Sequence, residues 1–184
     1  MSRAVLISIR PKWCELIASG KKTVEIRKTA PHLKTPFKCY IYCTLSGSKE
    51  FFEEACRRDV ASWNRSKMSY KKGHVIGEFV CDRIIEWHYI PDPDESADPG
   101  SMAYDVLTVD GEKTGLEYDD FEDYGKGAPL YGWHISDLVI YDDPKKLSDF
   151  RLYNTSTVIE HGLPMPTHEI KRPPQSWCYV RCAP

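Results

Sequence analysis

Short β-rich runs dominate this chain, and they do not alternate regularly with helices. Apolar and β-branched residues concentrate at residues 4–9, 22–28, 38–45, 74–89, 130–141 and 177–182. Helical spacing is confined to a few short segments. Many strands with few helices predict an α+β fold around a mixed sheet or barrel, with short flanking helices.

The clearest helical segment follows the first strand. Pro11 stands where a first helical residue is favoured, and Trp13, Leu16 and Ile17 recur at i, i+3 and i+4. Gly20 comes after the last apolar position and suits a left-handed helix end. A second helix is expected at residues 51–63. The first segment therefore predicts one short helix that turns directly into the next strand.

The chain length predicts a single domain over residues 1–184. Residues 90–127 change character, because they are rich in turn-forming and acidic residues with interleaved aromatics. We expect an insertion or lid there, with a little helix, and not a second domain. Its alternatives are a surface that mimics nucleic-acid charge and a solvated helix. A lid folded against the basic part of the chain would favour a small ligand or a single flipped base over extended RNA.

Composition points to a cytoplasmic protein with neither membrane association nor cofactor. No apolar run approaches the roughly 20 residues that a bilayer requires. Seven cysteines without a small-scaffold pattern suit free thiols in a reducing compartment. In each of the pairs Cys39/Cys43 and Cys178/Cys182, the two cysteines would lie roughly 13 Å from each other along a strand. This is too far to share one zinc ion, so we predict no metal site. With no heptad pattern to indicate an oligomer, a monomer is the default expectation.

Charge is distributed unevenly along the chain. Residues 1–74 hold 16 Lys and Arg against 6 Asp and Glu, whereas residues 75–143 hold 3 against 18. A basic first third is able to form a phosphate-facing surface for nucleic acid. Alternatively, the basic and acidic segments face each other in the fold. The sequence leaves both interpretations open.

Residues 6–27 carry the most informative pattern, in which a strand, a helix and a glycine turn lead into a second strand. On that second strand Glu25 and Arg27 share one face, and Lys22 precedes them. At a barrel mouth, these three side chains would present a cation, an acid and a second cation to one concavity. The alternative is a solvated charge network on a strand face.

The run from Gly20 to Arg27, GKKTVEIR, resembles the signature of the ASCH family, with a glycine, a lysine two residues on and an arginine five residues later. Residues 73–84 resemble the later strand of that family that bears an acidic residue, here Glu78. Residues 131–138 resemble its late strand with an aromatic–histidine pair, here Trp133 and His134. These three segments occur in the family order.

The resemblance implies a PUA-like β-barrel whose cleft binds RNA or nucleotide-like ligands. Some small members of the family are amidohydrolases that remove the acetyl group of 4-acetylcytidine, using a lysine, a threonine three residues later and a glutamate. Those positions fall on Lys22, Glu25 and Glu78, so a glutamate stands where the threonine nucleophile would be. Glu25 cannot replace that hydroxyl in the same role, but a carboxylate is able to act as a general base on water.

The sequence therefore predicts a module that binds RNA or a modified nucleobase, with an amidohydrolase as the first alternative. A ribonuclease and a protein-interaction module are further alternatives. The expected catalytic set is Lys22, Glu25 and Glu78. The expected ligand-binding residues are Arg10, Lys21, Lys22, Arg27, Trp133 and His134. For Trp133 and His134 the alternative is a core aromatic with a satisfied histidine partner.

Overall fold

The structure is a computed structural model. It describes residues 3–45, 72–91, 102–104, 114–116, 118–153, 159–160, 163–164 and 169–182. The predicted helix at residues 51–63 lies outside these ranges.

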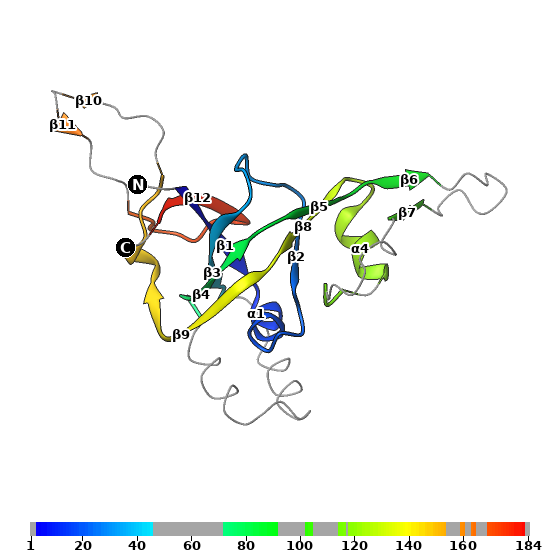
Figure 1. Ribbon diagram of the computed structural model, residues 1–184, viewed down its shortest axis with the longest axis horizontal. Helices are drawn as coiled ribbons and strands as arrows, with labels where there is room; N and C mark the ends of the chain where they lie inside the picture. Colours follow the sequence, from blue (N-terminus) through cyan, green and yellow to red (C-terminus); the bar gives the residue numbers. More distant parts are fainter. Residues whose placement is uncertain are drawn as a thin grey trace.

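A mixed five-stranded sheet forms the centre of the molecule (Figure 1). Its order is β12 (Trp177–Arg181), β1 (Arg3–Ile9), β3 (Phe37–Cys43), β4 (His74–Cys81) and β9 (Ser136–Lys146). The β1 and β3 strands are parallel, and the other neighbours are antiparallel. The β-rich run at residues 177–182 is confirmed as the strand β12, which pairs with β1.

A second, three-stranded sheet places β8 (Leu130–His134) between β2 (Val24–Arg27) and β5 (Ile84–Trp87). Two small hairpins pair β6 (Tyr89–Pro91) with β7 (Met102–Tyr104), and β10 (Ile159–Glu160) with β11 (Leu163–Pro164). The described helices are α1 (Pro11–Ala18), α4 (Tyr118–Gly125) and the 3₁₀ turn η2 (Leu147–Asp149). The α+β prediction is confirmed. The described strands pair into separate sheets and do not show a closed barrel.

The α1 helix forms as the sequence predicts. Pro11 is its first residue, and Cys14 and Ile17 are buried against the sheet. Gly20 adopts φ +70°, in the left-handed region that favours glycine, and its N–H donates to the carbonyl of Ile17 at 2.9 Å. This turn ends the helix and leads the chain into β2, so Lys22 lies directly beneath α1.

Side-chain alternation along β2 gives the strand two different faces. Val24 and Ile26 join a hydrophobic cluster with Trp87, Phe121 and Leu130. Glu25 and Arg27 consequently point to the opposite face, away from that cluster. Glu25 and Arg27 are therefore the charged side chains that β2 directs to this opposite face.

Two predicted strands are each divided in the structure. The run at residues 74–89 becomes β4 and β5, and the register of β4 against β9 shifts on both sides of Gly77. A Cβ at Gly77 would lie 2.4 Å from the carbonyl oxygen of Val139, so only glycine permits this approach. The run at residues 130–141 becomes β8 and β9.

None of the described helices has the length and apolar character that crossing a bilayer requires.

Candidate functional site

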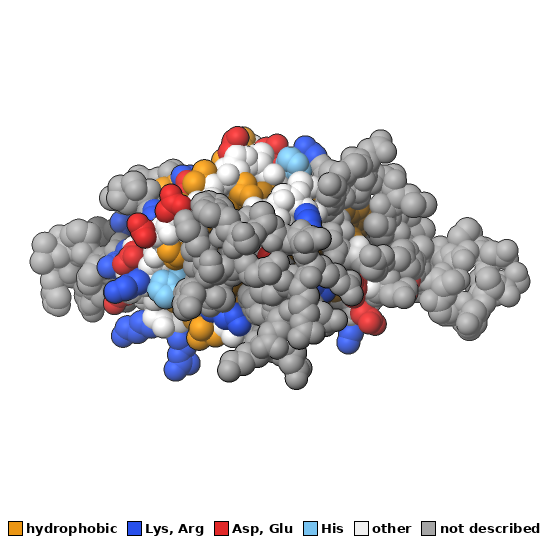
Figure 2. Space-filling model, turned by 90° about the horizontal axis from the view of Figure 1, so that it is seen from below, with side chains coloured by type: hydrophobic (Ala, Val, Ile, Leu, Met, Phe, Trp, Pro, Cys, Tyr) orange, Lys and Arg blue, Asp and Glu red, His pale blue; other side chains and the backbone are white. Residues whose placement is uncertain are grey.

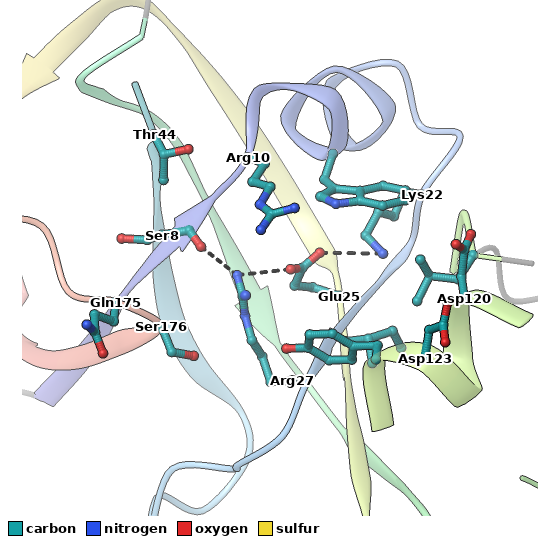
Figure 3. A pocket seen from close by; sticks show the side chains of 14 residues that line it. Ser8, Arg10, Lys22, Glu25, Arg27, Thr44, Asp120, Asp123, Gln175 and Ser176 are labelled. Carbon is teal, nitrogen blue, oxygen red and sulfur yellow. Dashed lines mark hydrogen bonds and ion pairs between the residues drawn. The ribbon is translucent and has the colours of Figure 1, made fainter. Parts of the chain in front are cut away.

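A pocket of about 610 Å³ opens where α1, β2 and α4 meet the end of β1 (Figure 3). Charged, aromatic and small polar side chains from distant parts of the sequence line it. The lining residues are Ser8, Arg10, Trp13, Lys22, Glu25, Ile26, Arg27, Thr44, Leu116, Asp120, Asp123, Tyr124, Gln175 and Ser176. This volume lies within the range usual for small-molecule sites.

A buried cluster of three charges forms the floor of the pocket. Glu25 Oε1 lies 3.0 Å from Arg27 NH2, and Glu25 Oε2 lies 3.4 Å from Lys22 Nζ. The side chains of Lys22 and Glu25 are only 2% and 5% exposed. The Glu25 carboxylate is thus buried between two cations, which compensate the cost of burying its charge.

Lys22 is enclosed on several sides. Its ammonium group donates to the carbonyl of Thr114 and lies 5.2 Å from the centroid of the Trp13 ring. Burial lowers the pKa of Lys22, while the charge of Glu25 opposes that shift. Gly115 packs close by with φ +73°, where an added Cβ would contact Trp13 and Lys22. The segment around residues 114–116 therefore covers the lysine.

Arg27 links the charge cluster to the strand β1. Its NH2 group donates to the carbonyl of Ser8 at 2.7 Å as well as to Glu25. Its Nε is buried and has no hydrogen-bond partner among the described residues. The Ser8 hydroxyl and N–H donate to the carbonyls of Pro174 and Ser176 at 2.7 and 2.8 Å. These bonds fix the segment before β12 at the pocket wall.

The α4 helix forms the opposite wall. Phe121 is fully buried and its ring meets that of Trp87 edge-on, with centroids 5.5 Å apart. This anchor turns Asp120, Asp123 and Tyr124 toward the pocket. In Figure 3 the two aspartates lie across the pocket from Gln175 and Ser176, with Glu25 between the two groups.

The basic and acidic parts of the chain meet at this pocket. Lys22 donates to the carbonyl of Thr114, and Lys28 Nζ lies 5.1 Å from the centroid of the Tyr124 ring. The face seen in Figure 2 carries described Lys, Arg, Asp and Glu side chains close together. Asp120 and Asp123 of the acidic segment line the same pocket as Lys22 and Arg27, so the basic and acidic segments are in contact around the site.

Comparison of the sequence with known protein families shows the family to which the chain belongs. The ASCH domain family matches residues 7–148, which include every pocket-lining residue except Gln175 and Ser176. The chain belongs to the ASCH family. At this level, ASCH proteins are associated with RNA binding and with hydrolase-like activity.

A solved ASCH structure from Zymomonas mobilis has a similar fold, and a second one shows a weaker likeness. A crystal structure of a serine-to-alanine mutant of ZmASCH is 20% identical, with a TM-score of 0.53, and covers 97% of this chain and 88% of that chain. The crystal structure of ASCH from the same organism is also 20% identical, with a TM-score of 0.49, and covers 97% and 87%. Among curated proteins no match is found. The likeness to the first of these structures concerns the fold alone.

The structure of this ASCH protein brings together four of the residues singled out from its sequence. Arg10, Lys22, Glu25 and Arg27 all line the pocket. Lys21 is exposed and does not line the pocket, whereas its neighbour Lys22 is buried in it. Sequence proximity to Lys22 was a poor guide at that position.

Glu78 lies outside the pocket. Its carboxylate accepts hydrogen bonds from Lys38 Nζ at 2.6 Å and from the Tyr141 hydroxyl at 2.5 Å. The next residue, Phe79, joins the same core cluster as Cys14 and Ile17 of α1. Because successive strand residues alternate, Glu78 faces the other side of the five-stranded sheet. The expected grouping of Glu78 with Lys22 and Glu25 is therefore not what the structure shows.

Trp133 and His134 also lie outside the pocket. Trp133 is fully buried and packs against Phe37 and Trp177, with ring centroids 5.9 and 5.8 Å apart. His134 Nδ1 lies 2.5 Å from Asp82 Oδ1. The alternative of a core aromatic beside a partnered histidine describes this pair.

Several residues that line the pocket were not predicted from the sequence as site residues. Trp13 was assigned only to a helix face, and Asp120 and Asp123 were treated as part of an undivided acidic segment. Gln175 and Ser176 carry no signal of their own, since only the pairing of β12 with β1 brings them to the site. Among the described residues, no group of three or more His, Cys, Asp or Glu is arranged to hold a metal ion.

Proposed function

We propose that this ASCH protein binds a single nucleobase in the pocket, either in RNA or in a modified nucleoside. The observation that carries the proposal is the buried Lys22–Glu25–Arg27 cluster at the pocket floor. Such a cluster offers donors and an acceptor within a few ångströms, which matches the mixed donor and acceptor edge of a base.

The pocket surroundings support recognition of a base. Trp13 and Tyr124 contribute aromatic surface, on which bases commonly stack. The α4 wall closes the side opposite Ser176, which disfavours a duplex and favours one base at a time. In this proposal Lys22 and Arg27 donate to a carbonyl oxygen, and Glu25 accepts from an exocyclic amine.

We propose that residues 1–184 form one cytoplasmic, monomeric domain, in which residues 90–127 are an insertion into a PUA-like barrel. The position of α4 at the pocket supports a lid-like role for that insertion. The thiols of the six described cysteines are free, as expected in a reducing compartment.

Direct binding measurements test the proposal. Tryptophan fluorescence and calorimetry would follow titration with the four common ribonucleosides, 4-acetylcytidine and short single-stranded RNA. We expect binding of at least one of them, weakened at least tenfold in Arg27→Lys, which keeps the charge but loses the planar fork. Lys38→Arg, on the other face of the sheet, is the matched control and should bind like wild type. Absence of binding at low salt would refute the proposal.

A second function, amide hydrolysis, is favoured by one observation. Lys22 has a pKa lowered by burial and lies against Glu25, so the pair is able to exchange a proton with a ligand or a water. Incubation with 4-acetylcytidine, with chromatography of substrate and cytidine, tests this reading. Turnover that Glu25→Gln abolishes while binding changes less than severalfold would establish it. Binding without turnover would leave base recognition alone.

A further inference from the structure

The charges that line the pocket are balanced. Arg10, Lys22 and Arg27 contribute three cations, and three carboxylates from β2 and α4 oppose them. The carboxylates belong to Glu25, Asp120 and Asp123. A pocket built for phosphate normally has an excess of positive charge or of N–H donors directed inward. This pocket has no such excess among its lining residues.

The two deepest cations are already engaged. Lys22 Nζ contacts Glu25 and the carbonyl of Thr114, and Arg27 NH2 contacts Glu25 and the carbonyl of Ser8. A phosphate would have to compete with Glu25 for both. The buried Nε of Arg27, in contrast, lacks a partner among the described residues. One neutral acceptor, such as a carbonyl oxygen, would satisfy this N–H without disturbing the cluster.

The α4 carboxylates are held at the pocket by packing. Phe121 is 0% exposed and meets Trp87 edge-on, so the helix cannot turn without losing this contact. Asp123 lies two residues beyond Phe121 and lines the pocket together with Asp120. Carboxylates at such a wall repel a phosphate and accept hydrogen bonds from hydroxyl groups.

We infer that the pocket selects an unphosphorylated ribonucleoside, with the base toward Arg27 and the ribose hydroxyls toward Asp123 and Asp120. This inference rests on the proposed function and narrows it from any base-containing ligand to a free nucleoside. A ribose hydroxyl donates to an α4 carboxylate, and a 5′-phosphate or an RNA chain is rejected by the same wall.

The test compares three ligands that share the base giving the strongest binding: the ribonucleoside, its 2′-deoxy analogue and its 5′-monophosphate. For the wild-type protein in low salt, we expect the monophosphate to bind about tenfold more weakly than the nucleoside, with the difference shrinking as salt is added. The deoxynucleoside should bind roughly three- to tenfold more weakly, as expected for the loss of one hydrogen bond.

Variants of α4 assign the selectivity to its carboxylates. Asp120→Asn with Asp123→Asn removes both charges at constant shape, and should bring the monophosphate to within about threefold of the nucleoside. Glu122→Gln removes one carboxylate charge from the same helix at a residue that does not line the pocket, and should keep the wild-type ratio.

Each outcome decides the inference. Tighter binding of the monophosphate or of RNA than of the nucleoside would overturn it and leave base recognition standing. An unchanged ratio in the double variant would overturn the role of α4. If no nucleoside, nucleotide or RNA binds, the proposed function fails, and the inference fails with it.

Discussion

Replacing Glu25 with glutamine should destabilise the protein far more than the same change at Glu78. Glu25 is 5% exposed, and its change leaves Lys22 and Arg27, which are 2% and 13% exposed, without their shared counter-charge. Removing one partner of a buried ion pair costs about 3–5 kcal/mol. Glu78 and Lys38 are 22% and 37% exposed, and a solvent-screened pair contributes about 1 kcal/mol or less.

Thermal unfolding followed by circular dichroism at pH 7 measures the difference. For a chain of this size, each kcal/mol shifts Tm by roughly 2–4 °C. Taking the lower bound of about 3 kcal/mol, Glu25→Gln should lower Tm by roughly 6–12 °C. Glu78→Gln should lower it by about 4 °C at most. Equal losses in the two variants would contradict the claim that the pocket floor is the more deeply buried charge cluster.

Three further predictions concern Lys22 and two packing contacts. Burial lowers the pKa of Lys22, so just below the ordinary lysine pKa the unfolded chain binds more protons than the folded protein. Lys22 should therefore make the free energy of unfolding rise with pH in that range. Urea unfolding at pH 7 and pH 10 should show that Lys22→Met loses this rise. Gly132→Ala places a Cβ 2.4 Å from the Trp87 ring and should cost about 1–3 kcal/mol in urea unfolding, and an unchanged midpoint would contradict this packing. Phe121→Ala should cost about 3–5 kcal/mol and weaken ligand binding, whereas loss of stability with intact binding would show that α4 does not shape the pocket.

The sequence predicted those parts of the fold that local chemistry determines. Pro11 and Gly20 mark the two ends of α1, because each residue has a backbone conformation that suits its position. Alternation along β2 correctly separated Glu25 and Arg27 from Val24 and Ile26. These features depend on neighbours within a few residues, which is the range over which sequence patterns are informative.

The membership of the pocket depends on long-range pairing, which local patterns do not reveal. Gln175 and Ser176 reach the site only because β12 pairs with β1 at the far end of the chain. Asp123 reaches it because Phe121 anchors α4 beneath Trp87. No sequence pattern in residues 116–124 singles out Asp120 and Asp123 as the carboxylates that line the pocket. Such contacts are fixed by the three-dimensional fold.

Glu78 shows how one strand face decides between two chemical interpretations. The amidohydrolase hypothesis, which is based on resemblance to the family, requires a lysine, a hydroxyl nucleophile and a glutamate around one ligand. Here Lys22 is in the pocket, Glu25 stands at the nucleophile position, and Glu78 is bound to Lys38 and Tyr141 across the sheet. Moving Glu78 to the pocket face would require a one-residue register change, which would also expose Phe79. Of the three residues expected to be catalytic, Lys22 and Glu25 therefore line the pocket and Glu78 does not.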